Sequence, residues 1–590
     1  MGKIASVKIL DPACGCGNFL IIAYRELRRL ELAVLWRLLE VSKRTDQKYL
    51  STVFTQGLNV DAMYGIEIED FPCRVAETAL YLVDHLANEE AAERLAKIFR
   101  RLPLSKAPHI VSRNALQIDW NEVVPASQLT AIVGNPPFIG KKVRSPEQVK
   151  DMKHVFDKHW KNYGELDYVA AWYVKAIRHI SGTSVPVAFV STNSLAQGEQ
   201  VGIFWPKMVR DGMKYHFAHR TFRWDNGAPG EASVYCVIIG WGLEESEKHQ
   251  LFDYATPTSE PHVQLVNRIN SYLVDFDDLF ISARRTPLCP APRISFGSMP
   301  NEAKPTRKEL AGLPEEEIQL RTQSQLLLTT QEKENLVAKE PGAAKWIRRI
   351  YGSVEFIHDI ERWCLWLKGM TPKELKALPE VLRRVEVVKA NRSASKRPTT
   401  KKLAQYAWLF GEDRQPEEPF ILIPRHSSES RQFVPMAIVS PEHIIGDACS
   451  AVHSSDLYHF GLLQSTMHMA WMRQICGRIK SDFRYSNEIV YNNFPWPPSP
   501  SPKQVETVRQ AAQAVLDERE KLEGQSLADL YDSDIMPVGI RKAHAGLDKA
   551  ADACHGRRKF DTELSRIRFL FERYSELKAA GQKKLDMTAG

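Results

Sequence analysis

Long apolar runs are missing from the 590-residue sequence, and their absence excludes one class of protein. The longest runs, VPVAFV (185–190) and VYCVIIG (234–240), fall far short of the roughly 18 residues that span a bilayer. The opening residues MGKIASVKIL also lack the apolar region of a signal peptide. We therefore expect a cytoplasmic protein without membrane spans.

Cysteine is present, but not in the spacings that bind metals. The nine Cys include no CxxC pair, and no His lies at zinc spacing from them. Scattered thiols suit a reducing compartment. We predict no disulfide and no metal site.

Neither sign of charge dominates, since 79 Lys and Arg stand against 72 Asp and Glu, for a net charge of +7. The clustering of the basic residues says more. They concentrate in 383–402 and in 472–486, the second with interleaved aromatics, as in nucleic-acid-binding segments. A solvated face explains either cluster equally well unless another part of the chain points to nucleic acid.

Composition is that of a soluble globular protein, with 44% hydrophobic and 26% charged residues. The length predicts about three to four domains. Changes in pattern along the chain divide it into an α/β domain (1–250), a connector with some helix (251–345), an aromatic-rich and basic domain (346–497) and a C-terminal helical module (498–590).

Short β-branched runs alternate with helical patterns in the first domain. This alternation predicts a doubly wound, mostly parallel sheet covered by helices. In such sheets ligands bind beyond the carboxyl ends of the strands. We therefore expect the residues just after VKIL, GIEI and AIVG to line one crevice.

The first strand runs into the turn DPACGCGNFL (11–20), which is typical of nucleotide-like cofactor sites. It is not the dinucleotide fingerprint, because the third Gly is missing and Asp11 would repel a pyrophosphate. An acid there suits a cationic ligand such as S-adenosylmethionine, and Gly15 and Gly17 let the backbone approach it closely. The alternative is a tight turn without a ligand.

Two later acids extend this hypothesis. Glu67 ends the strand GIEI, where an acid bonds ribose hydroxyls, and Ile68 would cover one face of the adenine. Asp119, in NALQIDW, is expected at the end of the next strand, where it would accept from the adenine amino group. Taken singly, each acid is also explained as an ordinary surface residue, and the long interval between Leu10 and Glu67 requires an extra helix.

The turn Asn135, Pro136, Pro137 and Phe138 follows the strand AIVG. Two prolines make the turn rigid and remove its N–H groups. The Asn135 side-chain oxygen and the Pro136 carbonyl can both accept from one exocyclic NH2 group, while Phe138 offers a face for stacking. An amine held this way turns its lone pair toward a sulfonium methyl, so positioning supplies much of the rate.

A base inside a duplex is out of reach, so this chemistry requires base flipping. Unstacking costs a few kcal/mol, which a separate DNA-binding region must offset. The basic second half of the chain then acquires a reason to bind nucleic acid.

In this order, DPACGCGNFL, GIEIED and GNPPF resemble the γ-class amino-methyltransferases of DNA, and NPPF rather than SPPW or SPPY implies adenine N6. Further segments, among them STNSLAQGEQV, IPRHSSESRQFVP, CGRIKSDFRYSNEIVYNNFPWP and SLADLYDSDIMP, resemble the MmeI-like (type IIL) restriction-modification enzymes. This resemblance covers nearly the whole chain. It implies a Rossmann-like, doubly wound class I methyltransferase domain, an α+β target-recognition domain (346–497) and a C-terminal helical part.

The resemblance also implies roles for particular residues. The cofactor S-adenosylmethionine would be bound by Asp11, Ala13, Gly15, Gly17, Asn18, Phe19, Glu67, Ile68, Asp119 and Trp120, and the flipped adenine by Asn135 to Phe138. Base-reading candidates follow the side-chain chemistry of major-groove readout. They are Arg425, Ser427, Glu429, Arg431, Arg478, Lys480, Asp482 and Arg484. Each is equally explained as a phosphate contact.

Members of this family carry a nuclease domain and a helical domain before the methyltransferase, whereas here Met1 lies just before the first strand. We therefore expect no DNA cleavage by this chain. The alternatives to a double-stranded-DNA methyltransferase are an inactive sequence-specific binding remnant, half of an enzyme completed by a separate N-terminal nuclease or helical polypeptide, and a protein-glutamine methyltransferase.

Overall fold

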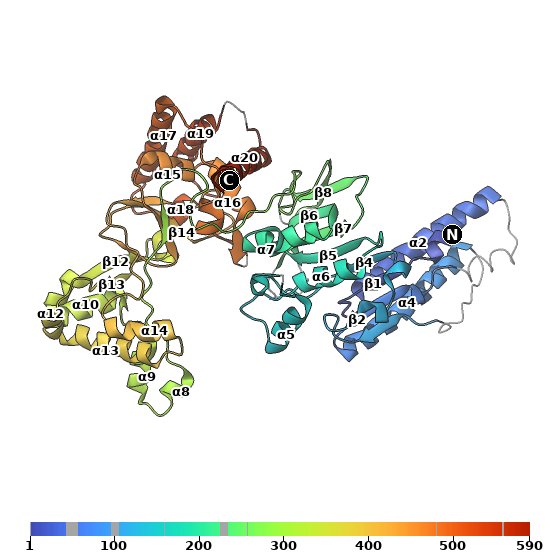
Figure 1. The fold of residues 1–590 in the computed structure, drawn as a ribbon, viewed down its shortest axis with the longest axis horizontal. Helices are drawn as coiled ribbons and strands as arrows, with labels where there is room; N and C mark the ends of the chain where they lie inside the picture. The colour runs from blue at the N-terminus through green and yellow to red at the C-terminus, as the bar shows by residue number, and fades with distance from the viewer. Residues whose placement is uncertain are drawn as a thin grey trace. The chain divides into compact units, whose positions relative to one another are not determined.

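The computed structural model describes residues 2–42, 57–95, 106–158, 160–224, 234–256, 258–479, 481–556 and 560–589. It divides into two compact units, residues 1–282 and 283–590 (Figure 1). Each unit is described by itself.

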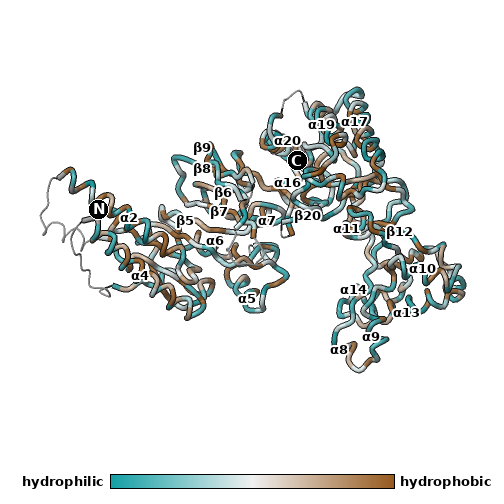
Figure 2. The backbone as a smooth tube through the Cα atoms, turned by 180° about the vertical axis from the view of Figure 1, so that it is seen from behind, coloured by the Kyte–Doolittle hydropathy of each residue, from teal (hydrophilic) through white to brown (hydrophobic). Residues whose placement is uncertain are grey.

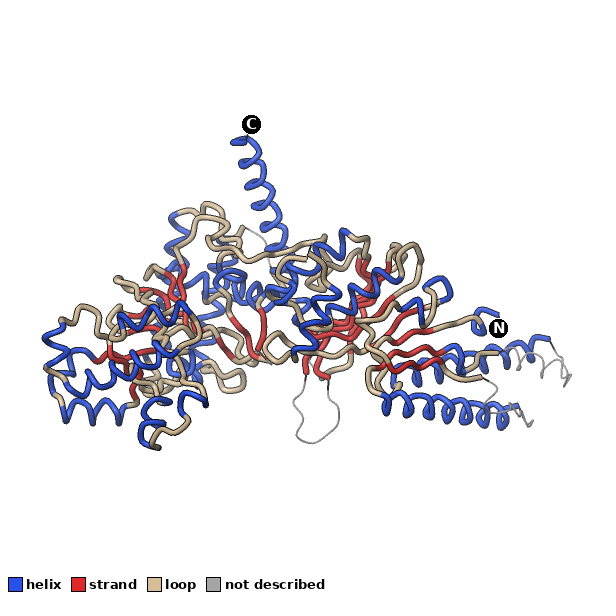
Figure 3. The backbone as a smooth tube through the Cα atoms, turned by 60° about the horizontal axis from the view of Figure 1, so that its bottom comes forward, coloured by secondary structure: helices blue, strands red, loops and turns tan. Residues whose placement is uncertain are grey.

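The first unit contains one nine-stranded sheet, with strand order β3-β2-β1-β4-β5-β7-β6-β8-β9. Figure 3 draws the strands of the chain in red. Its strands are β1 (Ile9–Asp11), β2 (Met63–Glu67), β3 (His109–Ser112), β4 (Ala131–Gly134), β5 (Val187–Thr192), β6 (Lys214–Trp224), β7 (Val234–Gly242), β8 (His249–Tyr254) and β9 (Pro261–Val266). The five strands from β3 to β5 are parallel, and β7 runs antiparallel to β5. The predicted doubly wound sheet is confirmed.

Helices accompany these strands. The unit contains α1 (Gly2–Ala5), α2 (Asn18–Ser42), α4 (Asp70–Leu95), α5 (Pro146–Val155), α6 (Ala170–His179) and α7 (Glu199–Arg210), with short helices η1 (Val60–Ala62), η2 (Trp120–Glu122), η3 (Ala126–Gln128), η4 (Tyr163–Glu165) and η5 (Asn193–Ala196). The helix α2 fills part of the long interval between β1 and β2. It begins directly after Gly17, where a Cβ atom would lie 2.9 Å from the Cβ of Ala76 in α4, so glycine permits the two helices to approach.

The second unit contains three small sheets, ordered β10-β18-β14-β16, β11-β13-β12-β17 and β15-β20-β19. Their strands are β10 (Ile294–Phe296), β11 (Leu327–Leu328), β12 (Ile347–Tyr351), β13 (Trp363–Leu365), β14 (Phe420–Pro424), β15 (His426–Ser427), β16 (Ala437–Val439), β17 (Ile444–Ile445), β18 (Cys449–Val452), β19 (Gly477–Ile479) and β20 (Asp482–Arg484).

The helices of this unit fall before, between and after its strands. They are α8 (Arg307–Leu310), α9 (Glu315–Thr322), α10 (Thr330–Lys339), η6 (Pro341–Trp346), α11 (Ser353–Ile357), α12 (Pro372–Lys376), α13 (Pro379–Ala394), α14 (Pro398–Lys402), η7 (Leu403–Tyr406), α15 (Leu457–Leu463), α16 (Thr466–Ile475), η8 (Asn487–Tyr491), α17 (Pro502–Glu520), α18 (Leu527–Leu530), α19 (Val538–Cys554) and α20 (Glu563–Ala589). The predicted α+β architecture followed by helices is confirmed.

The segment 251–345 differs from the connector that we expected. Its first part supplies β9 and most of β8, which extend the nine-stranded sheet beyond β6. Its second part supplies β10, α8, α9, β11 and α10 to the second unit. Short strands among polar and Pro-containing residues carry little periodicity, which explains why the pattern was missed.

No helix in the described part of the chain is long and apolar enough to cross a bilayer. Figure 2 shows hydrophobic and hydrophilic residues alternating along the helices, as expected where one face of each helix packs on a core.

Candidate functional site

Asp11, the last residue of β1, is buried, and the turn that follows it has open space at Gly15. Asp11 is 1% exposed, and its Oδ1 accepts a hydrogen bond from the Ala13 amide at 3.0 Å. Burial raises the pKa of Asp11, the hydrogen bond from Ala13 lowers it and the nearby Glu67 carboxylate raises it, with a net result of about 7. Gly15 has φ +52°, and a Cβ atom there would meet nothing within 4 Å. A cationic ligand at this turn would favour the charged form of Asp11.

Glu67 joins the end of β2 to the same turn. Its Oε2 accepts from the Gly15 amide at 3.0 Å, and its Oε1 accepts from the amides of Ile68 and Glu69 at 2.9 and 3.1 Å. Three of the roughly four acceptor positions of a carboxylate are thus used by backbone. Glu67 positions the glycine turn and retains capacity for about one further donor.

The NPPF turn directly follows a residue that lies close to Asp11. A Cβ atom at Gly134 would sit 2.7 Å from Asp11 Oδ1, so glycine permits the end of β4 to approach this carboxylate. Directly after it, Asn135 Oδ1 is buried and has no hydrogen-bond partner in the described ranges. An unpaired buried acceptor costs about 1–3 kcal/mol, and native proteins rarely retain one without a use.

A second buried acid holds this turn in place. Asp167 Oδ1 accepts from the Ile139 amide at 3.2 Å, and its Oδ2 accepts from the Thr192 hydroxyl at the end of β5 at 3.5 Å. Burial raises the pKa of Asp167, against the hydrogen bond from Ile139 and the charge of Arg144, which lower it. The carboxylate therefore ties the NPPF turn to the neighbouring strand.

The helix α6 is tied to the other side of the site, because Trp172 Nε1 donates to the Pro12 carbonyl at 2.9 Å. Sequence reasoning missed both Asp167 and Trp172. The signal for them is weak: Asp167, the second of two acids in GELDYVAAW, stands directly before an apolar helical run.

The expected position of Asp119 is wrong. The strand β3 ends at Ser112, and Asp119 instead caps η2, accepting from the Asn121 amide at 2.9 Å and from Asn121 Nδ2 at 3.0 Å. The amide hydrogen bond lowers the pKa of Asp119. The apolar pattern of NALQIDW arises from turns that place Trp120 in the core, where its Nε1 donates to the Ala115 carbonyl at 2.8 Å.

The remaining cofactor candidates follow β1 and β2 at the carboxyl edge of the sheet. Ile68 is 63% exposed and Asn18 is exposed, whereas Ala13 and Phe19 are half-buried. Gly17 is buried and has φ +85°, a conformation that favours glycine.

In the second unit, the three-stranded sheet brings the two base-reading segments together. The strand β15 pairs with β20, with His426 opposite Arg484, and β20 pairs with β19. Arg478 Nη1 lies 3.0 Å from Glu429 Oε2, and the Arg478 guanidinium stacks 4.5 Å from the centre of the Phe483 ring. Candidates from distant parts of the sequence therefore share one small sheet and its adjoining loop.

The environments of the other candidates differ. Arg425 is half-buried, donates to the Asp447 carbonyl at 2.7 Å and stacks on Phe296, which indicates a structural role. Ser427 is buried, Arg431 is half-buried, and Asp482 and Arg484 are exposed. Lys480 lies outside the described residues.

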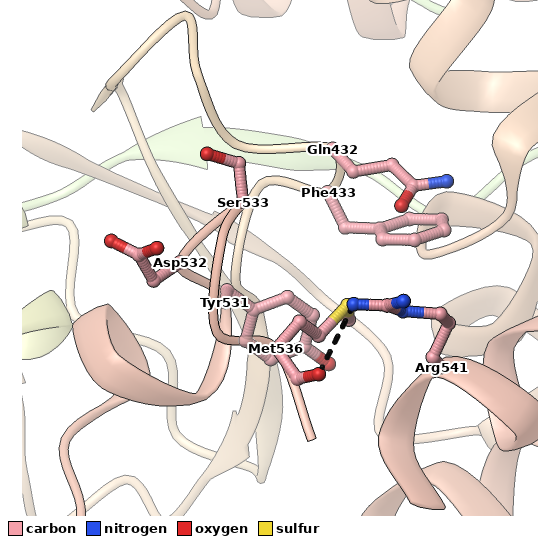
Figure 4. Close-up of a pocket in the computed structure, with 7 residues that line it drawn as sticks. All are labelled: Gln432, Phe433, Tyr531, Asp532, Ser533, Met536 and Arg541. Atoms are coloured by element: carbon pink, nitrogen blue, oxygen red, sulfur yellow. Dashed lines mark hydrogen bonds between the residues drawn. The ribbon is translucent and has the colours of Figure 1, made fainter. Parts of the chain in front are cut away.

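A separate cavity of about 270 Å³ adjoins the segment after Arg431 (Figure 4). It is lined by Gln432, Phe433, Tyr531, Asp532, Ser533, Met536 and Arg541, and Arg541 Nη2 donates across it to the Met536 carbonyl at 3.3 Å. None of the expected site residues lines it. The described residues include no group of three or more His, Cys, Asp or Glu placed to hold a metal ion.

The strand order, with β7 antiparallel beside β5, and the glycine turn after β1 define the first unit as a class I methyltransferase fold. Family models match nearly the whole chain: the MmeI DNA-methyltransferase domain (1–253), target recognition domain (275–498) and C-terminal domain (500–580). The structure of the type IIL restriction-modification enzyme MmeI in complex with DNA is 41% identical, with a TM-score of 0.85 over 98% of this chain and 74% of that one. This chain belongs to the MmeI family.

A curated relative, DNA methyltransferase A from Bacillus subtilis (strain 168), is 34% identical over 579 residues. The match covers 98% of this chain but 62% of the relative, so this chain spans less than two thirds of that protein.

Proposed function

We propose that this chain transfers a methyl group from S-adenosylmethionine to the N6 amino group of an adenine flipped out of double-stranded DNA, at a specific sequence, in a restriction-modification or phage-defence system. The observation that carries the proposal is the buried, unpaired Oδ1 of Asn135, the residue that directly follows the close approach of Gly134 to Asp11. The names of the two relatives, one a DNA methyltransferase and one an enzyme bound to DNA, support the substrate.

The NPPF turn supplies the recognition of an amine. Asn135 Oδ1 and the Pro136 carbonyl accept from the two hydrogens of one NH2 group, and Phe138 stacks on the base. Because both acceptors lie on one rigid turn, the nitrogen lone pair is held in one direction. An amino group attacks without a strong base, so these residues act by orientation.

The β1 turn fits the cofactor. The carboxylate of Asp11 pairs with the cationic methionine end of the cofactor. The open space at Gly15 lets the cofactor approach the backbone closely. The remaining acceptor capacity of Glu67 suits a ribose hydroxyl. When bound, S-adenosylmethionine supplies an electrophilic methyl group. The chain's part is to orient the amine toward it and to exclude water.

The second unit would read the sequence. Asp482 and Arg484 are exposed on β20, and the Glu429–Arg478 pair lies beside them. Carboxylates and guanidinium groups are the side chains that read cytosine and guanine edges in the major groove.

The test is transfer of label from radiolabelled S-adenosylmethionine to mixed genomic DNA. Asn135→Ala removes the unpaired acceptor, and we expect it to abolish transfer while sequence-specific DNA binding persists. Asn59→Ala is the matched control. Asn59 precedes the amino-terminal end of β2, whereas the proposed site lies at the carboxyl ends of the strands, and its Nδ2 already donates to the Gly57 carbonyl.

Label recovered as N6-methyladenine from wild type and Asn59→Ala, but not from Asn135→Ala, supports the proposal. Equal loss of transfer and of DNA binding in Asn135→Ala contradicts the role of the turn. Specific binding by wild type without any label means that the chain is a recognition remnant or half of an enzyme.

A further inference from the structure

The edge of the sheet beside the NPPF turn holds further unpaired polar groups. Asn193 is 5% exposed and its Nδ2 has no hydrogen-bond partner within the described part of the chain. Gln197 is 8% exposed, and its Oε1 is unpaired among the same residues. With Asn135 Oδ1 this makes three buried, unpaired side-chain amide atoms, located directly after β4, directly after β5 and at the end of η5.

One carboxylate joins the neighbours of Asn193 and of the NPPF turn. The short helix η5 begins with Asn193, directly after β5, and β5 is the parallel neighbour of β4 with Gly134 opposite Phe189. Asp167 holds Ile139, at the end of the turn, and Thr192, the residue before Asn193.

Hydrogen bonds from the helix α7 also fix the loop that carries Asn193. Trp205 Nε1 donates to the Leu195 carbonyl at 2.6 Å, and Gln200 Oε1 accepts from the Asp167 amide at 2.8 Å. Gly198 has φ +66°, which favours glycine at this bend. These contacts hold the loop, and with it the backbone of Asn193, in one conformation.

We propose that Asn193 donates from Nδ2 to the ring nitrogen that flanks the amino group of the flipped adenine, N1 or N7; this rests on the proposed function. Adenine presents an NH2 donor next to a ring-nitrogen acceptor on each of these edges. Asn135 supplies the acceptor that the amine needs, and Asn193 supplies the donor that the ring nitrogen needs. Guanine presents O6 and N1–H on its Watson–Crick edge, which this pair does not match.

The donor fixes what the NPPF turn leaves free. Both hydrogen bonds of the NPPF turn go to one exocyclic nitrogen, so they restrain the rest of the ring only through that atom. A third hydrogen bond, to a ring nitrogen, restrains the base at a second point and so reduces its motion relative to the methyl donor. Losing a hydrogen bond of this kind costs about 10- to 100-fold in rate.

The experiment combines variants with single-atom analogues of the target base. Duplexes carry adenine, 1-deazaadenine or 7-deazaadenine at the methylated position, and single-turnover transfer is measured with wild type, Asn193→Ala and Asn193→Asp. The Asp variant keeps the shape and removes the donor. Asn59→Ala serves again as the control at the opposite edge of the sheet.

Wild type should lose about 10- to 100-fold on one of the two analogues, which identifies the nitrogen. Both Asn193 variants should lose a similar factor on adenine and lose nothing further on that analogue, because the hydrogen bond is already absent. Asn59→Ala should keep the discrimination of wild type. Such non-additivity is a readout that a merely structural role would not produce.

Full analogue discrimination retained by both Asn193 variants overturns the inference, as does a loss confined to the KM for S-adenosylmethionine. If wild type transfers no methyl group, the proposed function fails, and the same comparison is made in DNA affinity. Analogue-dependent affinity that disappears in the Asn193 variants then still supports Asn193 as the donor, and its absence overturns it.

Discussion

At the scale of single residues, the burial of Asp11 makes the binding of a cationic ligand depend on pH. Burial raises the pKa of this carboxyl to about 7, so near neutral pH its protonated and ionised forms are both populated. A cationic partner favours the carboxylate, and binding therefore has to displace the proton below that pH. The α-amino group of the cofactor stays cationic up to a pH of about 7.7, which leaves Asp11 as the titrating partner.

We predict that affinity for S-adenosylmethionine rises about tenfold per pH unit between roughly pH 5.5 and 7, and then levels off. The unliganded protein should show the opposite trend. Because the folded-state pKa of Asp11 lies above its ordinary value, its contribution to the free energy of unfolding falls as pH rises toward 7. Calorimetric titration across this range measures the first effect, and thermal unfolding measures the second.

Asp11→Asn provides the control for this prediction, since it removes the titrating group. The variant should bind weakly and with little pH dependence below pH 7. A wild-type affinity that stays constant from pH 5.5 to 7 would show that Asp11 does not contact the cationic end of the cofactor.

At the scale of elements, the site depends on how closely β4 approaches β1. A methyl group at Gly134 would lie 2.7 Å from Asp11 Oδ1, closer than such atoms come in real proteins, so the carboxylate or the strand end has to move. Asn135 follows at once, and a shift there moves the amine acceptor as well. Both halves of the proposed site therefore depend on this glycine.

Gly134→Ala is predicted to lower transfer by about 100-fold and to weaken cofactor binding, because displacements near 1 Å cost that much in rate. Gly140→Ala is the matched control, since a Cβ atom there meets nothing within 4 Å. Single-turnover transfer and calorimetry of both variants measure the difference. Equal behaviour of the two variants would mean that the β1–β4 contact is not part of the working site.

The small sheet of the second unit supports a different prediction. Arg484→Ala is expected to relax the preference at one position of the recognition sequence, at a cost of about 1–3 kcal/mol for the favoured base. Arg349→Ala is the control, because Arg349 is paired with Asp359 at 2.7 Å. Binding to randomised duplexes distinguishes the outcomes, and uniform weakening on every sequence would make Arg484 a phosphate contact.

Some of these elements could be predicted from the sequence and others could not. Strands β1, β2 and β4 end in Gly, Pro and acidic residues, which mark both the strand ends and the ligand edge. Asp119 was misplaced because turns can bury a Trp as well as a strand does. Asp167 and Asn193 were missed because their roles arise from contacts between segments that lie far apart in the sequence.

At the scale of the whole molecule, the net charge of +7 is small, so its distribution decides how strongly the protein binds DNA. The basic segment 383–402 forms most of α13, all of α14 and the residues between them. Within this segment Lys396, Lys401 and Lys402 are exposed. The sequence left two explanations for this segment open, a solvated face and a phosphate-binding surface. Counterion release separates them, because each phosphate that a lysine neutralises steepens the dependence of affinity on salt.

We predict that replacing Lys396, Lys401 and Lys402 by Gln lowers the slope of log affinity against log salt by roughly 0.9 for each phosphate that the variant no longer neutralises, without changing the preferred sequence. Lys345→Gln is the control, because its ammonium is already paired with Glu374 at 2.8 Å and should contribute little. Fluorescence anisotropy between about 50 and 200 mM salt, an interval over which several phosphate-bound cations change affinity greatly, measures the slope. An unchanged slope in the triple variant would make the segment a solvated face, and the affinity that offsets base flipping would then have to come from other residues.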